Sequence, residues 1–362
     1  MYYEHLVEEF PEESTLVLTV AEINGKKIQE TAGVIRRKLL LKSKLIWPKW
    51  LPLLWQIWKI ARQNKIKMIQ VGQILPVGTA AFILNKFFRI PYMVYCHGMD
   101  VMLAAQSPRK KRLARKILKD AEFIVANSDF TKEKILEYGV RPQNVTVVHP
   151  CPNMKLPRKS APEEIDELKN KYGLQNKKII LTTGRLVERK GHDVVLGALH
   201  KLKESVPNAH YAIIGEGPQE KAVRQMIRIL KLEDSVSLVG KATDYGLAAW
   251  YEACDVFVMI SRQLKDEDAE GFGIVYLEAN MFGKPVIAGK SGGVAEAVVD
   301  NETGILVEPT NPHEIISAME KLLKNPNEAR RLGENGRERV EREFQWKKQA
   351  EPILKRLETI NR

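Results

Sequence analysis

Short apolar runs rich in Val, Ile and Leu alternate along this chain with stretches whose apolar residues recur at helical spacing. In the first half the strand-like runs lie at residues 68–71, 92–96, 123–128 and 145–148. In the second half they lie at residues 178–182, 211–214, 236–239, 256–259 and 285–288. Strands that alternate with helices predict α/β architecture with parallel, doubly wound sheets, whose ligands bind at the carboxyl ends of the strands.

The chain has 362 residues, which is too long for a single small domain and predicts two. Three prolines between positions 150 and 157 mark a connection between them. We therefore predict an N-terminal domain over residues 1–152 and a C-terminal domain that begins at residue 153 and extends to residue 340.

The composition excludes several classes of protein. No run of 18 or more uncharged apolar residues occurs, so no membrane-spanning helix is expected. The N-terminus lacks the order of basic, apolar and small residues that defines a signal peptide. Cys96, Cys151 and Cys254 stand far apart with no C-x-x-C pair, which predicts a reduced, cytoplasmic protein without structural zinc.

The positive charge is concentrated in the first half of the chain. Of the net +12, residues 1–150 contribute +11, from 24 Lys and Arg against 13 Asp and Glu. An asymmetry of this size indicates an anionic partner, either a membrane surface or a nucleic acid, unless it only improves solubility.

Tryptophan and basic residues are interleaved in this basic half. Four of the six tryptophans, Trp47, Trp50, Trp55 and Trp58, fall within twelve positions, and residues 107–120 contain seven Lys or Arg. This combination favours peripheral binding to an anionic membrane, such as the inner face of the plasma membrane, although the helical spacing of residues 51–61 also suits a packed core. No helix-turn-helix or RNA-binding signature accompanies the charge, so we expect no nucleic-acid partner.

Residues 270–289 read E-G-F-G-I-V-Y-L-E-A-N-M-F-G-K-P-V-I-A-G. They predict a glycine-rich loop, an apolar helix of about ten residues that stops at Gly283, and a strand. The free amides at the start of such a helix suit a diphosphate. Glu270 before the helix and Glu278 within it could each bind hydroxyls, of a sugar and of a ribose. The alternative is a buried helix with a glycine-rich entry loop.

A second loop, residues 183–191, reads T-G-R-L-V-E-R-K-G and follows a predicted strand. It lacks G-x-G-x-x-G, which argues against a dinucleotide site of the dehydrogenase type. Its cations Arg185 and Lys190 lie five positions apart at a strand end, where they could neutralise a diphosphate leaving group.

Together with S-G-G-V-A-E at 291–296, the stretch from 270 to 289 resembles the donor-site signature of the retaining glycosyltransferase family 4, and most resembles its phosphatidylinositol mannosyltransferase-type members. The resemblance spans nearly the whole chain and is strongest after residue 175. It implies the GT-B fold, in which two Rossmann-like domains face each other across a cleft. It also implies that a helix in residues 341–362 crosses back to the N-terminal, acceptor-side domain, which here lacks the family's first strand and glycine-pair loop.

The resemblance also implies roles for individual residues. The catalytic positions are His97, Arg185, Lys190 and Glu270. The donor-binding positions are Gly240, Lys241, Gly271, Phe272, Gly273, Ile274, Val275 and Glu278. Within this set, His97 and Glu270 would hold the sugar, Glu278 the ribose, and Gly240 with Lys241 the nucleotide base.

The implied reaction moves a hexose, with mannose favoured, from GDP-mannose or a UDP-sugar to a hydroxyl of a lipid or glycan, with retained configuration. No cofactor and no metal are expected, although Asp266-Glu267-Asp268 offers a D-x-D alternative. Two other functions stay open. A donor-binding but inactive partner subunit is compatible with the missing glycine-pair loop, and a sugar-nucleotide epimerase of the same fold would need an additional acid/base group.

Overall fold

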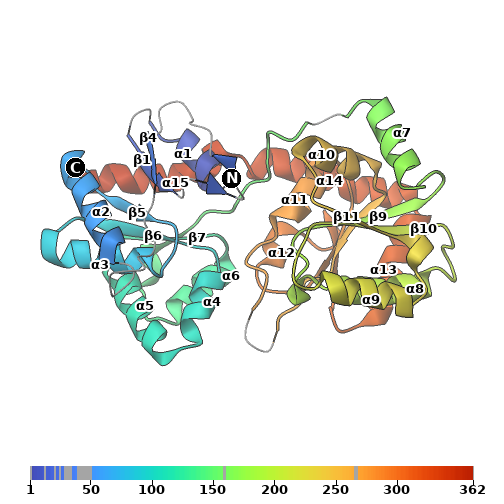
Figure 1. Cartoon of the computed structure of the whole chain (residues 1–362), viewed down its shortest axis with the longest axis horizontal. Coiled ribbons are helices and arrows are strands. Elements are labelled where there is room, and N and C mark those ends of the chain that lie inside the picture. Colours follow the sequence, from blue (N-terminus) through green and yellow to red (C-terminus); the bar gives the residue numbers. More distant parts are fainter. Residues whose placement is uncertain are drawn as a thin grey trace. The chain divides into compact units, whose positions relative to one another are not determined.

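The computed structural model of the chain describes residues 2–11, 14–19, 22–23, 26–27, 35–38, 51–157, 160–264 and 268–361. Contacts divide the chain into two compact units (Figure 1). The N-terminal unit comprises Met1–Pro150 and Trp346–Arg362, and the C-terminal unit comprises Cys151–Gln345. Trp47, Trp50, Asp266 and Glu267 lie outside the described residues.

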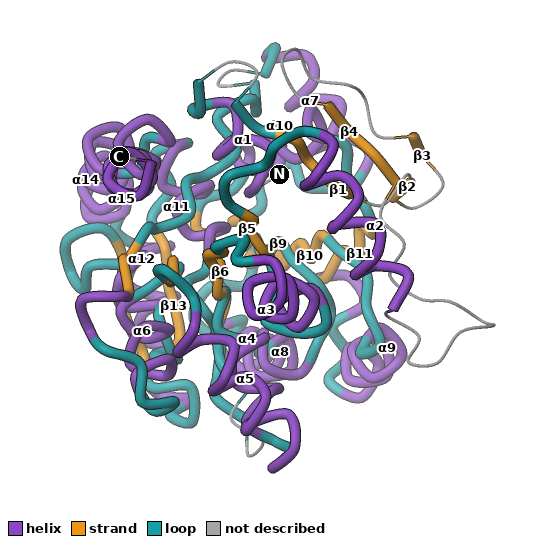
Figure 2. Tube along the Cα trace, turned by 90° about the vertical axis from the view of Figure 1, so that its left-hand side faces the viewer, coloured by secondary structure: helices purple, strands orange, loops and turns teal. Residues whose placement is uncertain are grey.

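The N-terminal unit is built on a sheet of four parallel strands in the order β5-β6-β7-β8. The strands are β5 (Ile69–Val71), β6 (Tyr92–Cys96), β7 (Ile124–Ala126) and β8 (Val145–Val147). Every residue of β6 and β7 is buried, as expected for parallel strands covered on both faces. The helices are α2 (Leu51–Gln63), α3 (Val77–Phe88), α4 (Met99–Ala105), α5 (Pro108–Asp120) and α6 (Asp129–Leu136), with a 3-10 turn at Pro142–Asn144. Helices α3, α4 and α6 pack against the strands (Figure 2).

Both ends of the chain join this unit. Helix α1 (Tyr2–Glu8) contacts α15 (Trp346–Asn361), where the Tyr2 and His5 rings lie 5.2 Å and 5.7 Å from the Trp346 ring. Strand β1 (Leu16–Thr19) pairs in parallel with β4 (Ile35–Lys38), and β2 (Glu22–Ile23) pairs antiparallel with β3 (Lys26–Lys27). The last helix of the chain thus packs on the first.

The C-terminal unit contains a sheet of six parallel strands in the order β11-β10-β9-β12-β13-β14. The strands are β9 (Lys178–Thr183), β10 (Ala209–Ile214), β11 (Val236–Gly240), β12 (Val256–Met259), β13 (Val286–Gly289) and β14 (Gly304–Val307). In chain order the sheet reads third, second, first, fourth, fifth, sixth. The order therefore reverses between β9 and β12, and doubly wound sheets bind ligands at this point.

Helices flank this sheet, and a close contact between two of them fixes the end of one helix. They are α7 (Pro162–Lys171), α8 (His192–Leu202), α9 (Glu220–Ile229), α10 (Asp244–Ala253), α11 (Ile274–Met281), α12 (Val294–Ala297), α13 (Pro312–Lys324) and α14 (Pro326–Glu343), with 3-10 turns at Glu188–Lys190 and Glu233–Ser235. Helix α14 approaches α11 so closely that an added Cβ at Gly333 would lie 1.9 Å from the carbonyl oxygen of Gly283. Glycine is required there, and the contact fixes the end of α11.

Each unit has its own hydrophobic core. Val71, Leu84 and Ile117 belong to the core of the N-terminal unit, whereas Ile180 and Met319 belong to that of the C-terminal unit. The predicted doubly wound α/β architecture is confirmed. One element differs in length, because α11 has eight residues rather than about ten. Phe282 leaves the helix, and Gly283 follows in a left-handed conformation with φ of +66°.

Among the described residues, no helix combines the length and apolar character needed to cross a membrane.

Candidate active site

Two loops and the start of α11 meet at the carboxyl edge of the C-terminal sheet, where the strand order reverses. The loop after β9 ends at Gly191, and an added Cβ there would lie 2.1 Å from the carbonyl oxygen of Ile260 in the loop after β12. The amide of Arg262 donates to the carbonyl oxygen of Arg189 across the same contact, at 2.8 Å. The loop after β9 and the loop that leads from β12 to α11 are therefore neighbours.

Glu270 accepts hydrogen bonds from two cations at this contact. Its Oε2 atom lies 2.5 Å from Lys190 Nζ and 2.6 Å from Arg189 Nη1, and it also accepts from Ser261 Oγ at 3.3 Å. Glu270 and Lys190 are only 8% and 9% exposed. Burial alone would raise the pKa of the Glu270 carboxyl, but attraction and hydrogen bonds from Lys190 and Arg189 outweigh it and hold the pKa below its ordinary value. The carboxylate is therefore ionised at neutral pH.

The S-G-G segment of the sequence holds the backbone of this glutamate. The amide of Gly293 donates to the carbonyl oxygen of Glu270 at 2.9 Å, and the Glu270 amide donates to Ser291 Oγ at 3.5 Å. Both groups belong to the loop between β13 and α12. The segment that carried the family resemblance thus orients Glu270.

Glu278 is buried to the same degree as Glu270, at 8% exposed, but its partners are neutral. The Tyr251 hydroxyl, from α10, donates to Glu278 Oε2 at 2.9 Å and lies 2.9 Å from Thr183 Oγ1 at the end of β9. Burial raises the pKa of the Glu278 carboxyl, and hydrogen bonds from Tyr251 and the Asn153 amide only partly oppose this rise. This carboxyl group holds its proton more tightly than Glu270 does.

The turn before α11 requires glycine at position 273. Gly273 has φ of +96°, and an added Cβ would lie 2.5 Å from the Tyr276 ring. Phe272 is buried, and its ring lies 5.9 Å from that of Phe344, so its side chain packs in the interior. Gly271, Ile274 and Val275 are half-buried. These residues present the first amides of α11, where the helix dipole is positive.

The two cations predicted from the loop after β9 differ in environment. Lys190 is buried and paired with Glu270, whereas Arg185 is exposed. At the end of β11, Gly240 has φ of +75°, and Lys241 forms an exposed ion pair with Glu216 at 3.3 Å. The predicted contacts of Arg185, Gly240 and Lys241 with a donor stay predictions.

His97 follows β6 in the N-terminal unit. Its Nε2 atom is hydrogen-bonded to the Tyr3 hydroxyl of α1, and its amide donates to Asp100 Oδ1 at 2.9 Å. Burial lowers the pKa of the imidazole to about 4 and raises that of the Asp100 carboxyl to about 6. His97 is therefore neutral at pH 7. Its predicted contact with a donor sugar stays a prediction.

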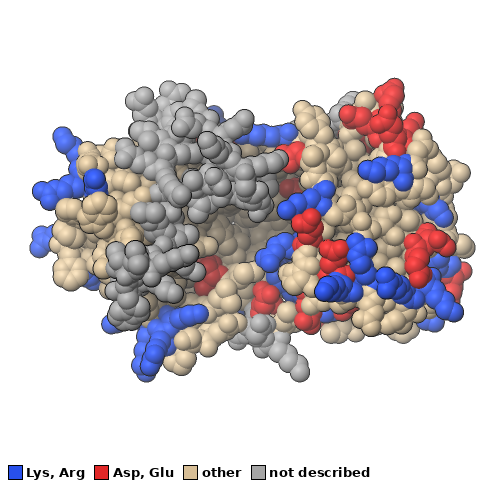
Figure 3. Space-filling model, in the orientation of Figure 1, with Lys and Arg blue, Asp and Glu red and all other residues tan. Residues whose placement is uncertain are grey.

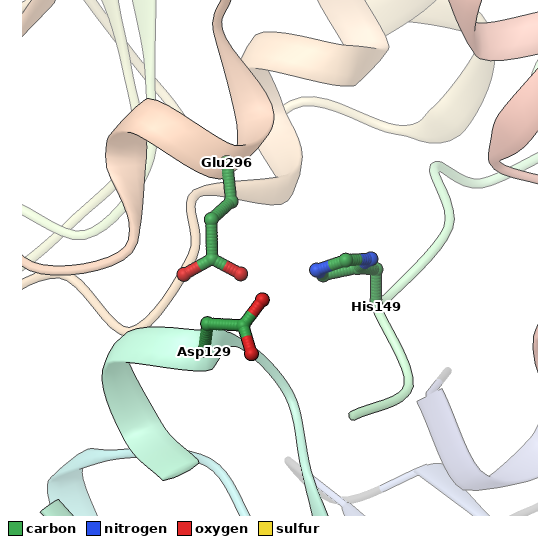
Figure 4. Close-up of side chains that lie close together, drawn as sticks. All are labelled: Asp129, His149 and Glu296. Carbon is green, nitrogen blue, oxygen red and sulfur yellow. The ribbon is translucent and has the colours of Figure 1, made fainter. Parts of the chain in front are cut away.

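Among the described residues, no three potential metal ligands from one unit lie close together. In the N-terminal unit, Asp129 follows β7 and His149 follows β8, and Figure 4 draws both with Glu296, which belongs to α12 of the C-terminal unit. Two side chains from one unit are fewer than the three or four that a structural or catalytic zinc uses. Of the acidic run at 266–268, only Asp268 lies in the described part of the chain, and it pairs with Arg189 Nε at 3.3 Å.

Arg189, Tyr251 and Tyr3 also contribute polar side chains to these sites, and the sequence did not predict them. Arg189 precedes the predicted Lys190 and reaches the same carboxylate oxygen. Tyr251 lies in an apolar helix and looks like an ordinary core residue, and Tyr3 is distant in sequence from His97. The sequence offered one signal for Arg189: it stands next to Lys190 in the loop after a strand, and one buried acid can bind two adjacent cations.

The chain matches two family descriptions and is similar to several known proteins. Residues 2–154 match Glycosyltransferase Family 4, and residues 164–339 match Glycosyl transferases group 1. The GDP-mannose-dependent alpha-(1-6)-phosphatidylinositol monomannoside mannosyltransferase of Mycolicibacterium smegmatis is 29% identical over 292 residues, covering 80% of this chain and 75% of that protein. The GDP-mannose-dependent monoacylated alpha-(1-6)-phosphatidylinositol monomannoside mannosyltransferase of Corynebacterium glutamicum is 28% identical over 306 residues, covering 83% and 78%.

The crystal structure of Anabaena HepE in complex with UDP-glucose is similar in fold. Its TM-score is 0.77 at 22% identity, covering 90% of this chain and 86% of that one. The predicted α/β fold class of GT-B type is therefore confirmed. With matches to both halves, this chain belongs to the glycosyltransferases, with a family 4 N-terminal region and a group 1 C-terminal region.

Proposed function

We propose that this glycosyltransferase moves a hexose, with mannose favoured, from a nucleotide-diphosphate sugar to a hydroxyl of a lipid or glycan. The configuration is retained and no metal takes part. The observation that carries the proposal is the buried cluster in which Lys190 and Arg189 hold Glu270 ionised beside the start of α11. GDP-mannose is the favoured donor because the relatives from Mycolicibacterium smegmatis and Corynebacterium glutamicum are GDP-mannose-dependent.

In this proposal the diphosphate binds at the start of α11. The free amides there and the cations Lys190 and Arg185 supply positive charge. The same charge stabilises the leaving group as the bond to the sugar breaks, so a metal ion is not needed for that step.

The two buried glutamates divide the binding of hydroxyls between them. In the described part of the chain, Lys190, Arg189 and Ser261 all bond to Oε2 of Glu270, so a sugar hydroxyl can donate to Oε1. Glu278 accepts from a neutral hydroxyl already, that of Tyr251, and we assign it to the ribose.

The chemical step exchanges one bond at the anomeric carbon for another. The acceptor oxygen forms a bond to this carbon on the face from which the diphosphate departs, and the bond between carbon and phosphate oxygen breaks. The proton of the attacking hydroxyl passes to the departing phosphate. We assign no nucleophilic role to Glu270, because its Oε2 is engaged by two cations.

The test is a transfer assay on the purified chain with GDP-mannose, UDP-glucose and UDP-N-acetylglucosamine. The acceptor is presented in vesicles containing phosphatidylinositol, with a chelator in parallel, and product configuration is read by NMR. We expect transfer from GDP-mannose with retention, unaffected by chelation. Lys190→Ala should lower turnover by roughly two to three orders of magnitude, whereas Lys221→Ala, on the exposed side of α9, should not. Equal rates for the two variants would contradict the site.

We also propose that α5 brings the enzyme to anionic lipid. Six of its seven basic residues are exposed, and Leu103 of the preceding helix α4 is 49% exposed. Lys and Arg side chains gather at the end of the N-terminal unit that carries this helix (Figure 3). Basic and apolar side chains together favour a lipid surface. Binding should be salt-dependent with anionic vesicles and absent with oligonucleotides, and the reverse would contradict the proposal.

A further inference from the structure

The hydroxyl of Tyr3 connects two strand ends of the N-terminal unit. It donates to the carbonyl oxygen of Gly72, which follows β5, at 2.8 Å, and it is hydrogen-bonded to Nε2 of His97, which follows β6. The three residues come from segments that are distant in sequence. The contact therefore links α1 to the carboxyl edge of the sheet, where the predicted sugar-binding histidine lies.

Counting protons fixes the direction of these bonds. A tyrosine hydroxyl carries one proton, and the Gly72 carbonyl can only accept it. The Tyr3 oxygen must then accept from His97, so the proton of the imidazole lies on Nε2. His97 is neutral at pH 7, and a neutral imidazole carries a single N–H. Its Nδ1 atom consequently carries no proton and can only accept a hydrogen bond.

The surroundings hold the tyrosine and the imidazole in this arrangement. An added Cβ at Gly72 would lie 2.9 Å from both Cζ and the hydroxyl oxygen of Tyr3, so glycine leaves the space that the phenol occupies. The Tyr2 ring lies edge-on to the imidazole at 4.9 Å, and the Tyr95 ring lies edge-on to Tyr3 at 5.4 Å. Aromatic rings thus restrict the rotation of both groups.

We propose that Tyr3 is a positioning residue that keeps the His97 proton on Nε2, so that Nδ1 accepts a hydrogen bond from a substrate hydroxyl. The assignment of the proton rests on the contacts of Tyr3 together with the neutral state of the imidazole, and it does not depend on the proposed function. The assignment of the hydroxyl rests on the proposed function. A histidine with the opposite proton arrangement would present a donor at Nδ1 and would repel the hydrogen of a hydroxyl oriented toward it.

NMR of the full-length protein, with its histidines isotopically labelled, tests which nitrogen of the His97 imidazole carries the proton. The His97 signals are assigned by their loss in His97→Gln. We expect the wild-type imidazole to stay neutral with the proton on Nε2 between about pH 5.5 and 8.5. In Tyr3→Phe the exchange of this proton with solvent should accelerate by roughly tenfold or more, because its acceptor is gone. Tyr2→Phe keeps the ring that packs on the imidazole, and it is the matched control with an expected change below about twofold.

The proposal would be overturned if His97 in the wild-type protein carried its proton on Nδ1. It would also be overturned if this proton exchanged with solvent at an unchanged rate in Tyr3→Phe. Gly72→Ala is a second variant, and it should reproduce the Tyr3→Phe spectrum because the methyl group displaces the phenol. In the transfer assay, Tyr3→Phe should lower kcat by roughly tenfold with little change in the donor KM. If no donor supports transfer, the proposed function fails while the NMR result still decides where the proton lies.

Discussion

Glu270 and Glu278 are two buried carboxyl groups whose surroundings act on their charge in opposite ways. We call the side chains of Lys190, Arg189 and Ser261 around Glu270 the first pocket. The second pocket is formed around Glu278 by the Tyr251 hydroxyl and the Asn153 amide. Both glutamates are 8% exposed, and they lie eight positions apart on either side of the start of α11. Two cations hold Glu270 ionised, whereas the hydrogen-bond partners of Glu278 are neutral and do not overcome burial, which leaves its pKa raised. Burial is therefore no guide to the charge of a carboxyl group, and the partners decide it.

This difference suggests a division of labour. An ionised carboxylate fixed between cations is rigid, and in the proposed function it accepts hydrogen bonds from the hydroxyls of the sugar. A carboxyl group held by a tyrosine hydroxyl tolerates either protonation state. We expect the first pocket to respond strongly to loss of charge and the second to respond weakly.

Replacing each glutamate by glutamine tests that expectation most strongly. Glu270→Gln removes the carboxylate partner of the buried Lys190 and one of the two carboxylates that Arg189 contacts, and it should lower the free energy of unfolding by about 3 to 5 kcal/mol. Glu278→Gln keeps a hydrogen-bond acceptor for Tyr251, so it should change the free energy of unfolding by less than about 1 kcal/mol. Urea denaturation followed by circular dichroism measures both. Equal losses would remove the distinction between the pockets.

Arg189→Gln weakens the first pocket without emptying it. Glu270 keeps its contact with Lys190, but it loses a charged donor at 2.6 Å. We expect a loss of about 1 to 3 kcal/mol in the free energy of unfolding, together with a rise in the pKa of Glu270. Arg228→Gln, on the exposed side of α9, is the control. No difference between the two variants would mean that Lys190 alone holds the carboxylate.

The pH dependence of stability should have opposite signs in the two pockets. The folded pKa of Glu270 lies below its ordinary value of 4.5, so its contribution is present above pH 4.5 and is lost as the pH falls through the folded pKa. The folded pKa of Glu278 lies above 4.5, so the folded state loses stability as the pH rises from 4.5 through that pKa.

The measurement compares the wild type with each glutamine variant across the acid range. The advantage of the wild type over Glu270→Gln should shrink on acidification. Its stability relative to Glu278→Gln should fall as the pH rises, by about 1.4 kcal/mol for each unit of pKa shift. Parallel curves for the two comparisons would contradict the assigned directions.

Tyr251→Phe is the mildest test of the second pocket. It removes one neutral hydrogen bond to Glu278 and one contact with Thr183, and it should cost about 1 kcal/mol. The Glu278 pKa should rise further, since the hydroxyl favours the ionised form. A fall in that pKa, followed by NMR of labelled glutamate, would show that the hydroxyl opposes ionisation instead.

The sequence was a good guide to the strands and a poorer guide to the partners of the buried acids. The strands β6 and β12 have the predicted bounds because an apolar run closed by a turn leaves little choice of ends. Gly273 and Gly283 marked both ends of α11 for the same reason. The residues next to each strand and helix end were therefore enough to predict where these elements stop.

The contacts of Glu270 could not be derived in this way. Which of two adjacent cations faces the carboxylate depends on the path of the loop after β9, and the 3-10 turn at Glu188–Lys190 brings both to it. Tyr251 and Tyr3 act over 27 and 94 positions in sequence. Such pairs are set by the packing of helices on the sheet, which a single sequence does not encode in any short pattern.

Calorimetric titration with GDP and with GDP-mannose tests the division of labour between the two glutamates most directly. If Glu278 binds the ribose, Glu278→Gln should weaken both ligands by the same factor, roughly tenfold. If Glu270 binds the sugar, Glu270→Gln should weaken GDP-mannose while GDP, which lacks the sugar, keeps or gains affinity. An equal loss for both ligands in Glu270→Gln, or a loss confined to GDP-mannose in Glu278→Gln, would contradict the account.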